Sequence, residues 1–216
     1  MKQSSYIALQ PVSGQEKALS TFLKEGAQIV QETEPETLLW TALQSPDLSQ
    51  CAIFDTFPTE GARDAHFAGQ VAAALNANAS TLVEGGWDNG VVPNIHNAVI
   101  IGSKVSTEAK NVSLATWIPF KARAGKVQDL ADLLAVGAKF VADKEPQTLF
   151  WFALQIDDNH FGIIDFFADQ AGIDAHFAGD AAAALHDNAA NLIEGGWEQG
   201  VLSGIQQFNA LAFLTR

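Results

Sequence analysis

Two histidines and two aspartates are the residues whose types and repeated positions could do chemistry. His66 and His176 stand in the same Ala-His-Phe-Ala-Gly motif, and Asp55 and Asp165 occupy matching places in the strand-like segments before it. An imidazole titrates near neutrality and can take a proton from a phenolic or enolic substrate. A carboxylate can orient that imidazole. The four residues are therefore predicted to be catalytic, with histidine as the base and aspartate as its orienting or charge-balancing partner.

The same four residues also have a structural interpretation. The imidazoles could hydrogen-bond a backbone carbonyl and hold a helix to a sheet, since buried polar groups need partners. The aspartates lie between apolar neighbours, where a carboxylate must be paired or protonated. They could accept hydrogen bonds from backbone or tryptophan N–H groups. The sequence leaves both interpretations open.

Aromatic residues recur around these pairs and could form the walls of a cavity for an aromatic ring. The predicted substrate-binding residues are Trp40, Trp151, Phe57, Phe167, Trp87 and Trp197. The first four could equally be ordinary core residues. Trp87 and Trp197 follow Gly-Gly turns, where they could plug the end of a barrel instead of touching a substrate.

The histidine motif is part of a duplication. Residues 54–87 and 164–197 are identical at 19 of 34 positions, at a constant offset of 110. Upstream, residues 34–44 and 145–155 share 8 of 11 positions at an offset of 111. Chance identity would be roughly one position in fifteen for average residue usage. A repeat of this length is the size of a domain and not of a solenoid unit.

Each half of the chain has the pattern β-α-β-β-α-β, the ferredoxin-like arrangement. The strands expected at about 37–44 and 148–155 are apolar on both faces, so we expect both faces to be covered. One face would meet helices and the other the sheet of the second repeat. The predicted fold class is α+β: tandem ferredoxin-like repeats packed sheet to sheet as an intrachain pseudo-dimeric α+β barrel.

The expected domains are residues 1–105 and 106–216, with a polar linker near 104–112. Within each domain, Gly69 or Gly179 is expected to interrupt the second helical segment. Asp180 is placed to cap the resumed helix in the second domain. Gly-Gly pairs are expected to end these segments.

Composition excludes several partners. The formal net charge is −13, spread over both halves, which leaves no basic face for nucleic acid or an anionic membrane. Cys51 is the only cysteine, so no intrachain disulfide is expected. No signal peptide or apolar run of membrane-spanning length is evident, and a cytoplasmic location is expected. No metal-ligand cluster or nucleotide-binding motif is present, so we expect neither a metal nor another cofactor.

The quoted motifs resemble those of the antibiotic biosynthesis monooxygenase (ABM) superfamily of dimeric α+β barrels. They are a strand reading Thr-Leu-x-Trp-x-Ala-Leu-Gln, a strand with an acid two residues before an aromatic, and the helix with Ala-His-Phe-Ala-Gly. The resemblance covers nearly the whole chain as two copies. It implies cofactor-independent oxygenation of a small aromatic, quinol or polyketide-like compound in a cavity within each half.

The resemblance also leaves other functions open. The chain could be a non-catalytic binder of a small apolar ligand, or a haem-degrading monooxygenase. Family members often carry Glu where this chain has Asp55 and Asp165, and many carry a second histidine where it has Val or Ala. In the haem-degrading branch, a Trp stands where this chain has His66 or His176, which argues against that activity. The expected partner is a small aromatic or apolar molecule, and the chain could be a monomer or a dimer of pseudo-dimers.

Overall fold

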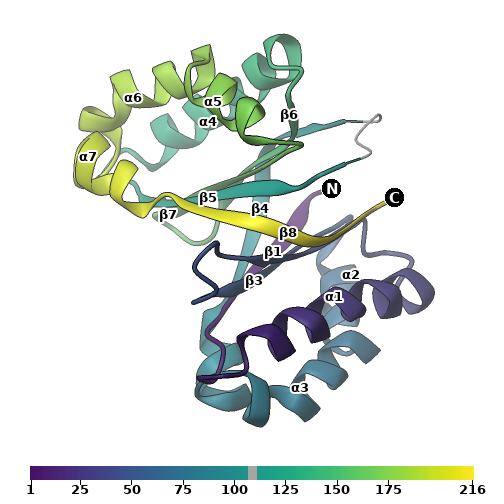
Figure 1. Cartoon of the computed structure of the whole chain (residues 1–216). Coiled ribbons are helices and arrows are strands. Elements are labelled where there is room, and N and C mark those ends of the chain that lie inside the picture. Colours follow the sequence, from purple (N-terminus) through teal and green to yellow (C-terminus); the bar gives the residue numbers. More distant parts are fainter. Residues whose placement is uncertain (107–110) are drawn as a thin grey trace. The chain divides into compact units, whose positions relative to one another are not determined.

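The computed structural model describes residues 1–106 and 111–216 and divides them into two compact units (Figure 1). Unit 1 comprises Met1–Ala98 with Asn209–Arg216, and unit 2 comprises Val99–Phe208. The predicted linker near 104–112 falls partly outside the described residues, because 107–110 are not among them. None of the helices in the described parts of the chain is both long and apolar enough to cross a membrane.

Unit 1 is an antiparallel sheet with helices on one face. In chain order its elements are β1 (Gln3–Leu9), α1 (Glu16–Thr33), β2 (Leu39–Gln44), β3 (Cys51–Phe57), α2 (Glu60–Phe67), α3 (Gln70–Leu82), the π-helix η1 (Trp87–Val91), the 3₁₀ turn η2 (Val92–Asn94) and the start of β4 (Ile95–Val105). Strand β3 lies between β1 and β2. Asp55 is opposite Ser5 on one side and Trp40 on the other, so these three side chains share one face.

Unit 2 repeats this arrangement. Its elements are β5 (Leu114–Lys121), α4 (Val127–Lys144), β6 (Thr148–Gln155), β7 (His160–Phe167), α5 (Gln170–Phe177), α6 (Asp180–Leu192), α7 (Gly196–Gly200), the 3₁₀ turn η3 (Leu202–Gly204) and the start of β8 (Gln206–Thr215). Strand β7 lies between β5 and β6. The coarse prediction of an α+β fold with ferredoxin-like β-α-β-β-α-β order is confirmed in both units.

The last strand of each repeat is divided between the units. Residues 95–98 of β4 lie in unit 1, where Ser4 Oγ donates to the Ala98 carbonyl at 3.5 Å. The remainder of β4 pairs with β6 in unit 2, from Val99 opposite Gln155 to Val105 opposite Phe150. Strand β8 correspondingly pairs with β2 in unit 1 through its C-terminal part. The compact units therefore differ from the sequence repeats 1–105 and 106–216 at their last strands.

The helical breaks follow local chemistry. Thr59 caps α2 by accepting a hydrogen bond from the Ala62 N–H at 3.2 Å, and α2 ends at Phe67 before α3 begins at Gln70. The predicted interruption at Gly69 is therefore confirmed. The prediction that Asp180 caps α6 is wrong: the N-cap is Gly179, and the Asp180 carboxylate instead pairs with Lys144 at 2.8 Å.

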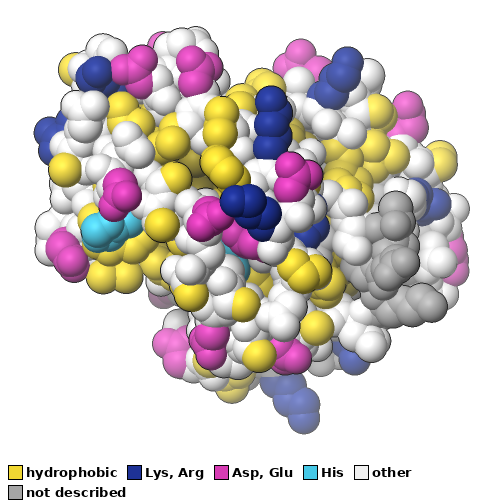
Figure 2. Space-filling model, turned by 90° about the horizontal axis from the view of Figure 1, so that it is seen from above, with side chains coloured by type: hydrophobic (Ala, Val, Ile, Leu, Met, Phe, Trp, Pro, Cys, Tyr) yellow, Lys and Arg dark blue, Asp and Glu magenta, His cyan; other side chains and the backbone are white. Residues whose placement is uncertain are grey.

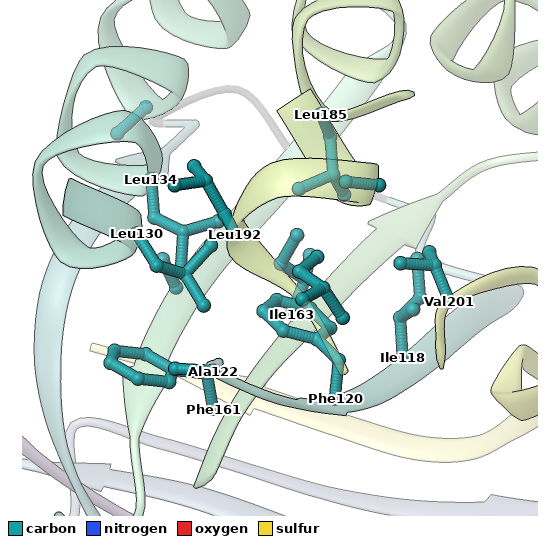
Figure 3. Packing of buried hydrophobic residues seen from close by; sticks show 14 of the residues in the cluster. Ile118, Phe120, Ala122, Leu130, Leu134, Phe161, Ile163, Leu185, Leu192 and Val201 are labelled. Carbon is teal, nitrogen blue, oxygen red and sulfur yellow. The ribbon is translucent and has the colours of Figure 1, made fainter. Parts of the chain in front are cut away.

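Each unit has its own apolar core between sheet and helices. In unit 2, Leu130 and Leu134 of α4 point toward Ile163 and Phe161 of β7 (Figure 3). The opposite faces of β2 and β3 are also buried, with every residue from Leu39 to Gln44 and from Cys51 to Phe57 shielded from solvent. Burial of both faces is as the sequence predicted. Packing of one sheet against the other stays a prediction.

The charged side chains are interspersed on the visible surface. On the face shown in Figure 2, Lys and Arg side chains alternate with Asp and Glu and do not form a continuous basic patch. Cys51 is buried and unpaired, and burial raises the pKa of its thiol to about 12.

Candidate functional site

The recurring histidine of unit 1 lies between two carboxylates. His66 is next to last in α2, and its side chain is 5% exposed. Its Nδ1 is 2.5 Å from Glu34 Oε2, and its Nε2 is 3.2 Å from Asp55 Oδ2. The second contact has ion-pair distance but lacks hydrogen-bond geometry, since neither Asp55 oxygen has a hydrogen-bond partner in the described part of the chain. The expected proximity of His66 and Asp55 is therefore observed, together with an unexpected second carboxylate.

Unit 2 builds the same array. His176 Nδ1 is 2.5 Å from Glu145 Oε2, and Nε2 is 3.2 Å from Asp165 Oδ2. Because the two units reproduce these distances, the duplicated motif encodes one three-residue arrangement twice. The carboxylates contact opposite nitrogens of the ring, so the three side chains do not converge on a single point as metal ligands would. Among the described residues, no group of three or more His, Cys, Asp or Glu could hold a metal ion.

Sequence reasoning missed Glu34 and Glu145. Each is the C-cap of the first helix of its repeat and is followed by proline, in a Glu-Pro-x-Thr turn. The sequence did mark them, because both glutamates recur at the same offset of 111 as Trp40 and Trp151. Acids beside proline in a turn are usually exposed, so the sequence did not predict that these glutamates belong to the site. The Glu34 side chain is only 8% exposed.

The carboxylates set the charge of the histidines. Burial opposes the imidazolium of His66, but Asp55 and Glu34 outweigh it and raise its pKa from 6.5 to about 10. In unit 2, burial is again opposed by Asp165 and Glu145, which raise the pKa of His176 to about 9. Both rings are therefore imidazolium ions at neutral pH. In that state neither can accept a proton.

The aspartates differ between the units. Thr116 Oγ donates a short hydrogen bond to Asp165 Oδ1. The corresponding residue of unit 1, Ser5, donates instead to Asn97 Oδ1 at 2.9 Å. Among the described residues, Asp55 consequently has an ion pair with His66 alone and no hydroxyl donor on Oδ1. The two arrays are alike in outline and different in how their aspartates are satisfied.

An apolar cavity adjoins each histidine, between the helices and the sheet. In unit 1 it measures about 30 Å³, and its lining includes Trp40, Trp87 and His66. In unit 2 it measures about 40 Å³ and includes Trp151 and His176. An engineered cavity of about 150 Å³ binds benzene, whereas one water needs about 10–15 Å³. The cavities as they stand are therefore too small for an aromatic ring.

The predicted aromatic residues divide into two groups. The four tryptophans predicted to bind substrate all line the inner cavities, namely Trp40, Trp87, Trp151 and Trp197. Phe57 and Phe167 do not line them. They lie against the imidazoles, with ring centroids 5.2 Å from His66 and 5.7 Å from His176. The phenylalanines thus shield the charged rings, and their role as substrate-binding residues stays a prediction.

Comparison with known proteins places this fold. No protein-family model and no curated protein matches the sequence. Among solved structures, a candidate monooxygenase from Fusobacterium nucleatum matches with a TM-score of 0.82 and 10% identity, over 100% of this chain and 94% of its own. A ferredoxin-fold protein from Listeria monocytogenes related to antibiotic biosynthesis monooxygenases matches with a TM-score of 0.54 and 10% identity, over 97% and 95% of the two chains. A haem-degrading enzyme from the same species matches with a TM-score of 0.54 and 10% identity, over 96% and 99%.

These similarities define the class of protein by its fold. The chain has the α+β fold of the ABM-related proteins, and its resemblance to that superfamily is confirmed at this level. Identities of 10% carry no information on the reaction. Function has to be argued from the site.

Proposed function

We propose that the chain is an ABM-type, cofactor-independent monooxygenase that acts on a small aromatic, quinol or polyketide-like compound. The repeats 1–105 and 106–216 would supply one site each. The observation that carries the proposal is the Glu–His–Asp array beside a tryptophan-lined cavity in both units. The pKa of each histidine is strongly shifted by its buried carboxylates, and such groups concentrate at functional sites.

The chemistry needs an electron-rich anion and molecular oxygen. The substrate loses a hydroxyl proton, and its anion passes one electron to O₂, which gives a substrate radical and superoxide. The two recombine through a new C–O bond, and the peroxide then loses water to give the oxygenated product. Exclusion of water protects both reactive species, which suits apolar walls.

The histidines would act in this reaction through their charge and their Nε2 proton. As an imidazolium, His66 or His176 stabilises the substrate anion and the superoxide, and can protonate the peroxide. Once it has given up that proton, the ring can take the hydroxyl proton of the next substrate, which is the base role expected from the sequence. Asp55 and Asp165 balance the charge. Because the cavities are about 30 and 40 Å³, substrate binding would have to displace lining side chains.

Oxygen consumption with a panel of phenols and hydroquinones tests the proposal. We expect the double variant His66→Gln/His176→Gln to lose turnover by about 10²-fold or more, the usual contribution of a positioned acid or base. His160→Gln is the matched control, because His160 is half-exposed, pairs with Asp157 on the surface and lines neither cavity. Wild-type protein that converts no compound, or a double variant with unchanged turnover, would contradict the proposal.

A second candidate is a non-catalytic binder of a small apolar molecule. Two observations favour it: both ring nitrogens of each histidine face carboxylates, and the cavity walls are almost wholly apolar. Such a protein would bind an apolar dye equally well before and after the double histidine substitution, and would consume no oxygen.

Haem degradation does not fit these residues. The inner cavities, at about 30 and 40 Å³, are far smaller than a porphyrin.

A further inference from the structure

The two glutamates beside the histidines are held more firmly than a charge partner needs. In unit 1, Thr37 Oγ1 donates to Glu34 Oε2 at 3.2 Å, the same oxygen that meets His66 Nδ1. A Cβ atom at Gly69 would lie 2.7 Å from Glu34 Oε1, so only glycine lets the carboxylate take this place. The Glu-Pro-x-Thr turn and the Ala-His-Phe-Ala-Gly motif, far apart in the sequence, thus complete one another.

Unit 2 reproduces each of these restraints. Thr148 Oγ1 donates to Glu145 Oε2 at 3.0 Å. A Cβ atom at Gly179 would lie 2.7 Å from Glu145 Oε1. Threonine, glycine and histidine therefore fix the carboxylate in both copies, although the exposed residues around them differ. Lys144 of unit 2, for example, occupies the place of Thr33.

Each histidine also separates two hollows. His66 lines the apolar inner cavity and, on its other side, a polar outer cleft of about 300 Å³ to which Glu34 and Thr37 belong. His176 does the same in unit 2, where the outer cleft measures about 380 Å³. Among the residues that line these hollows, His66 and His176 are the ones common to the inner and outer hollow of their unit. The glutamates line the outer clefts and not the inner cavities.

We propose that Glu34 and Glu145 are positioning residues that keep a proton on Nδ1 of their histidine, so that Nε2 alone exchanges a proton with a molecule in the inner cavity. The 2.5 Å contacts hold the Nδ1–H bond toward the carboxylate. The Nε2–aspartate contacts are longer, at 3.2 Å, so the Nε2 proton is held less closely than the Nδ1 proton.

The proton transfer changes the protonation of Nε2 only. The Nε2–H bond of the imidazolium breaks, and its proton goes to an anionic oxygen of the bound molecule. Nδ1–H stays on the neutral ring and donates to glutamate, and the hydroxyl proton of the next molecule restores the imidazolium. That the bound molecule is an oxygenase substrate rests on the proposed function, whereas the assignment of the two nitrogens does not.

Long-range ¹⁵N–¹H NMR of the full chain tests the assignment without any substrate. In the wild type, the neutral forms of His66 and His176 should be Nδ1–H tautomers. Glu34→Gln should lower the pKa of His66 by about 1 to 3, as expected when an adjacent opposite charge is lost, and leave His176 unchanged. The exposed neighbour Glu36→Gln should change neither.

A second variant guards against misfolding of the first. Thr37→Val keeps every charge and removes only the hydroxyl that donates to Glu34 Oε2, so it should weaken the Nδ1–H preference of His66 alone. An Nε2–H tautomer in the wild type, or a His66 pKa unmoved by Glu34→Gln, would overturn the inference. If the NMR result is as expected and no compound is oxidised, the positioning role stands and the proposed oxygenase function fails.

Discussion

Raising the pH should destabilise this protein through its two buried histidines. A group whose pKa is higher in the folded chain stabilises the fold fully below its unfolded pKa, and that stabilisation is lost as the pH rises through the folded pKa. For His66 the window runs from 6.5 to about 10, and for His176 from 6.5 to about 9. Within its window, each histidine lowers the free energy of unfolding by about 1.4 kcal/mol for every unit by which the pH rises.

Together the two histidines should remove about 4 kcal/mol between pH 7 and pH 8.5, where lysines and tyrosine do not yet titrate. That is a large part of the total stability of an ordinary domain, which is about 5–15 kcal/mol. Urea unfolding at the two pH values measures the change. The His66→Gln/His176→Gln variant is the control and should lose little stability over this range, and each single variant about half as much as the wild type. Equal losses in the wild type and the double variant would refute the reasoning, because the histidines would then titrate alike in the folded and unfolded chain.

Three further predictions concern packing and reactivity. Gly137→Ala should raise the free energy of unfolding in urea by up to about 1 kcal/mol, because the new Cβ would meet only an indole carbon of Trp151, at 3.8 Å. Gly26→Ala should raise it less, because its Cβ would lie 3.3 Å from an indole carbon of Trp40. Equal gains would contradict this difference in packing. Thr116→Val should cost about 1–3 kcal/mol in urea unfolding, because Asp165 loses its hydroxyl donor, and a neutral effect would show that this hydrogen bond is not needed. Cys51 should resist a thiol reagent at pH 8 in the folded chain and react after unfolding in urea, because burial raises the pKa of its thiol to about 12. Rapid labelling of the folded chain would contradict that burial.

Much of the fold could be predicted because its patterns are local. The strands expected at 37–44 and 148–155 are observed at Leu39–Gln44 and Thr148–Gln155. The helical break at Gly69 followed from the glycine itself. The division of β4 and β8 between the units could not be predicted in this way, since a strand's own residues do not say which strand it will pair with.

The site was predicted in part. Duplication singled out His66 and Asp55, and the structure brings them together. The repeat also contains Glu34, but a turn residue before proline gives no sign of being buried against a helix 32 positions away. Asp55 and the missed Glu34 together raise the pKa of His66 to about 10, which favours an imidazolium at neutral pH where the sequence predicted a base.

The size of the cavities could not be predicted from the sequence for a similar reason. Tryptophans at four lining positions indicated walls but not the distance between them. That distance is set by how closely the helices approach the sheet. Gly26 and Gly137 occupy the same position in the two helices, yet a Cβ atom would lie 3.3 Å from Trp40 at Gly26 and 3.8 Å from Trp151 at Gly137. The helix-to-sheet distance therefore differs between the units although the glycine is the same.

In each unit, two buried carboxylates hold a proton on the histidine between them, and NMR titration of the imidazole resonances of the wild-type chain measures this. His66 should titrate near pH 10 and His176 near pH 9, well above the ordinary value of 6.5. Titration of both rings near 6.5 would show that the carboxylates do not hold these protons.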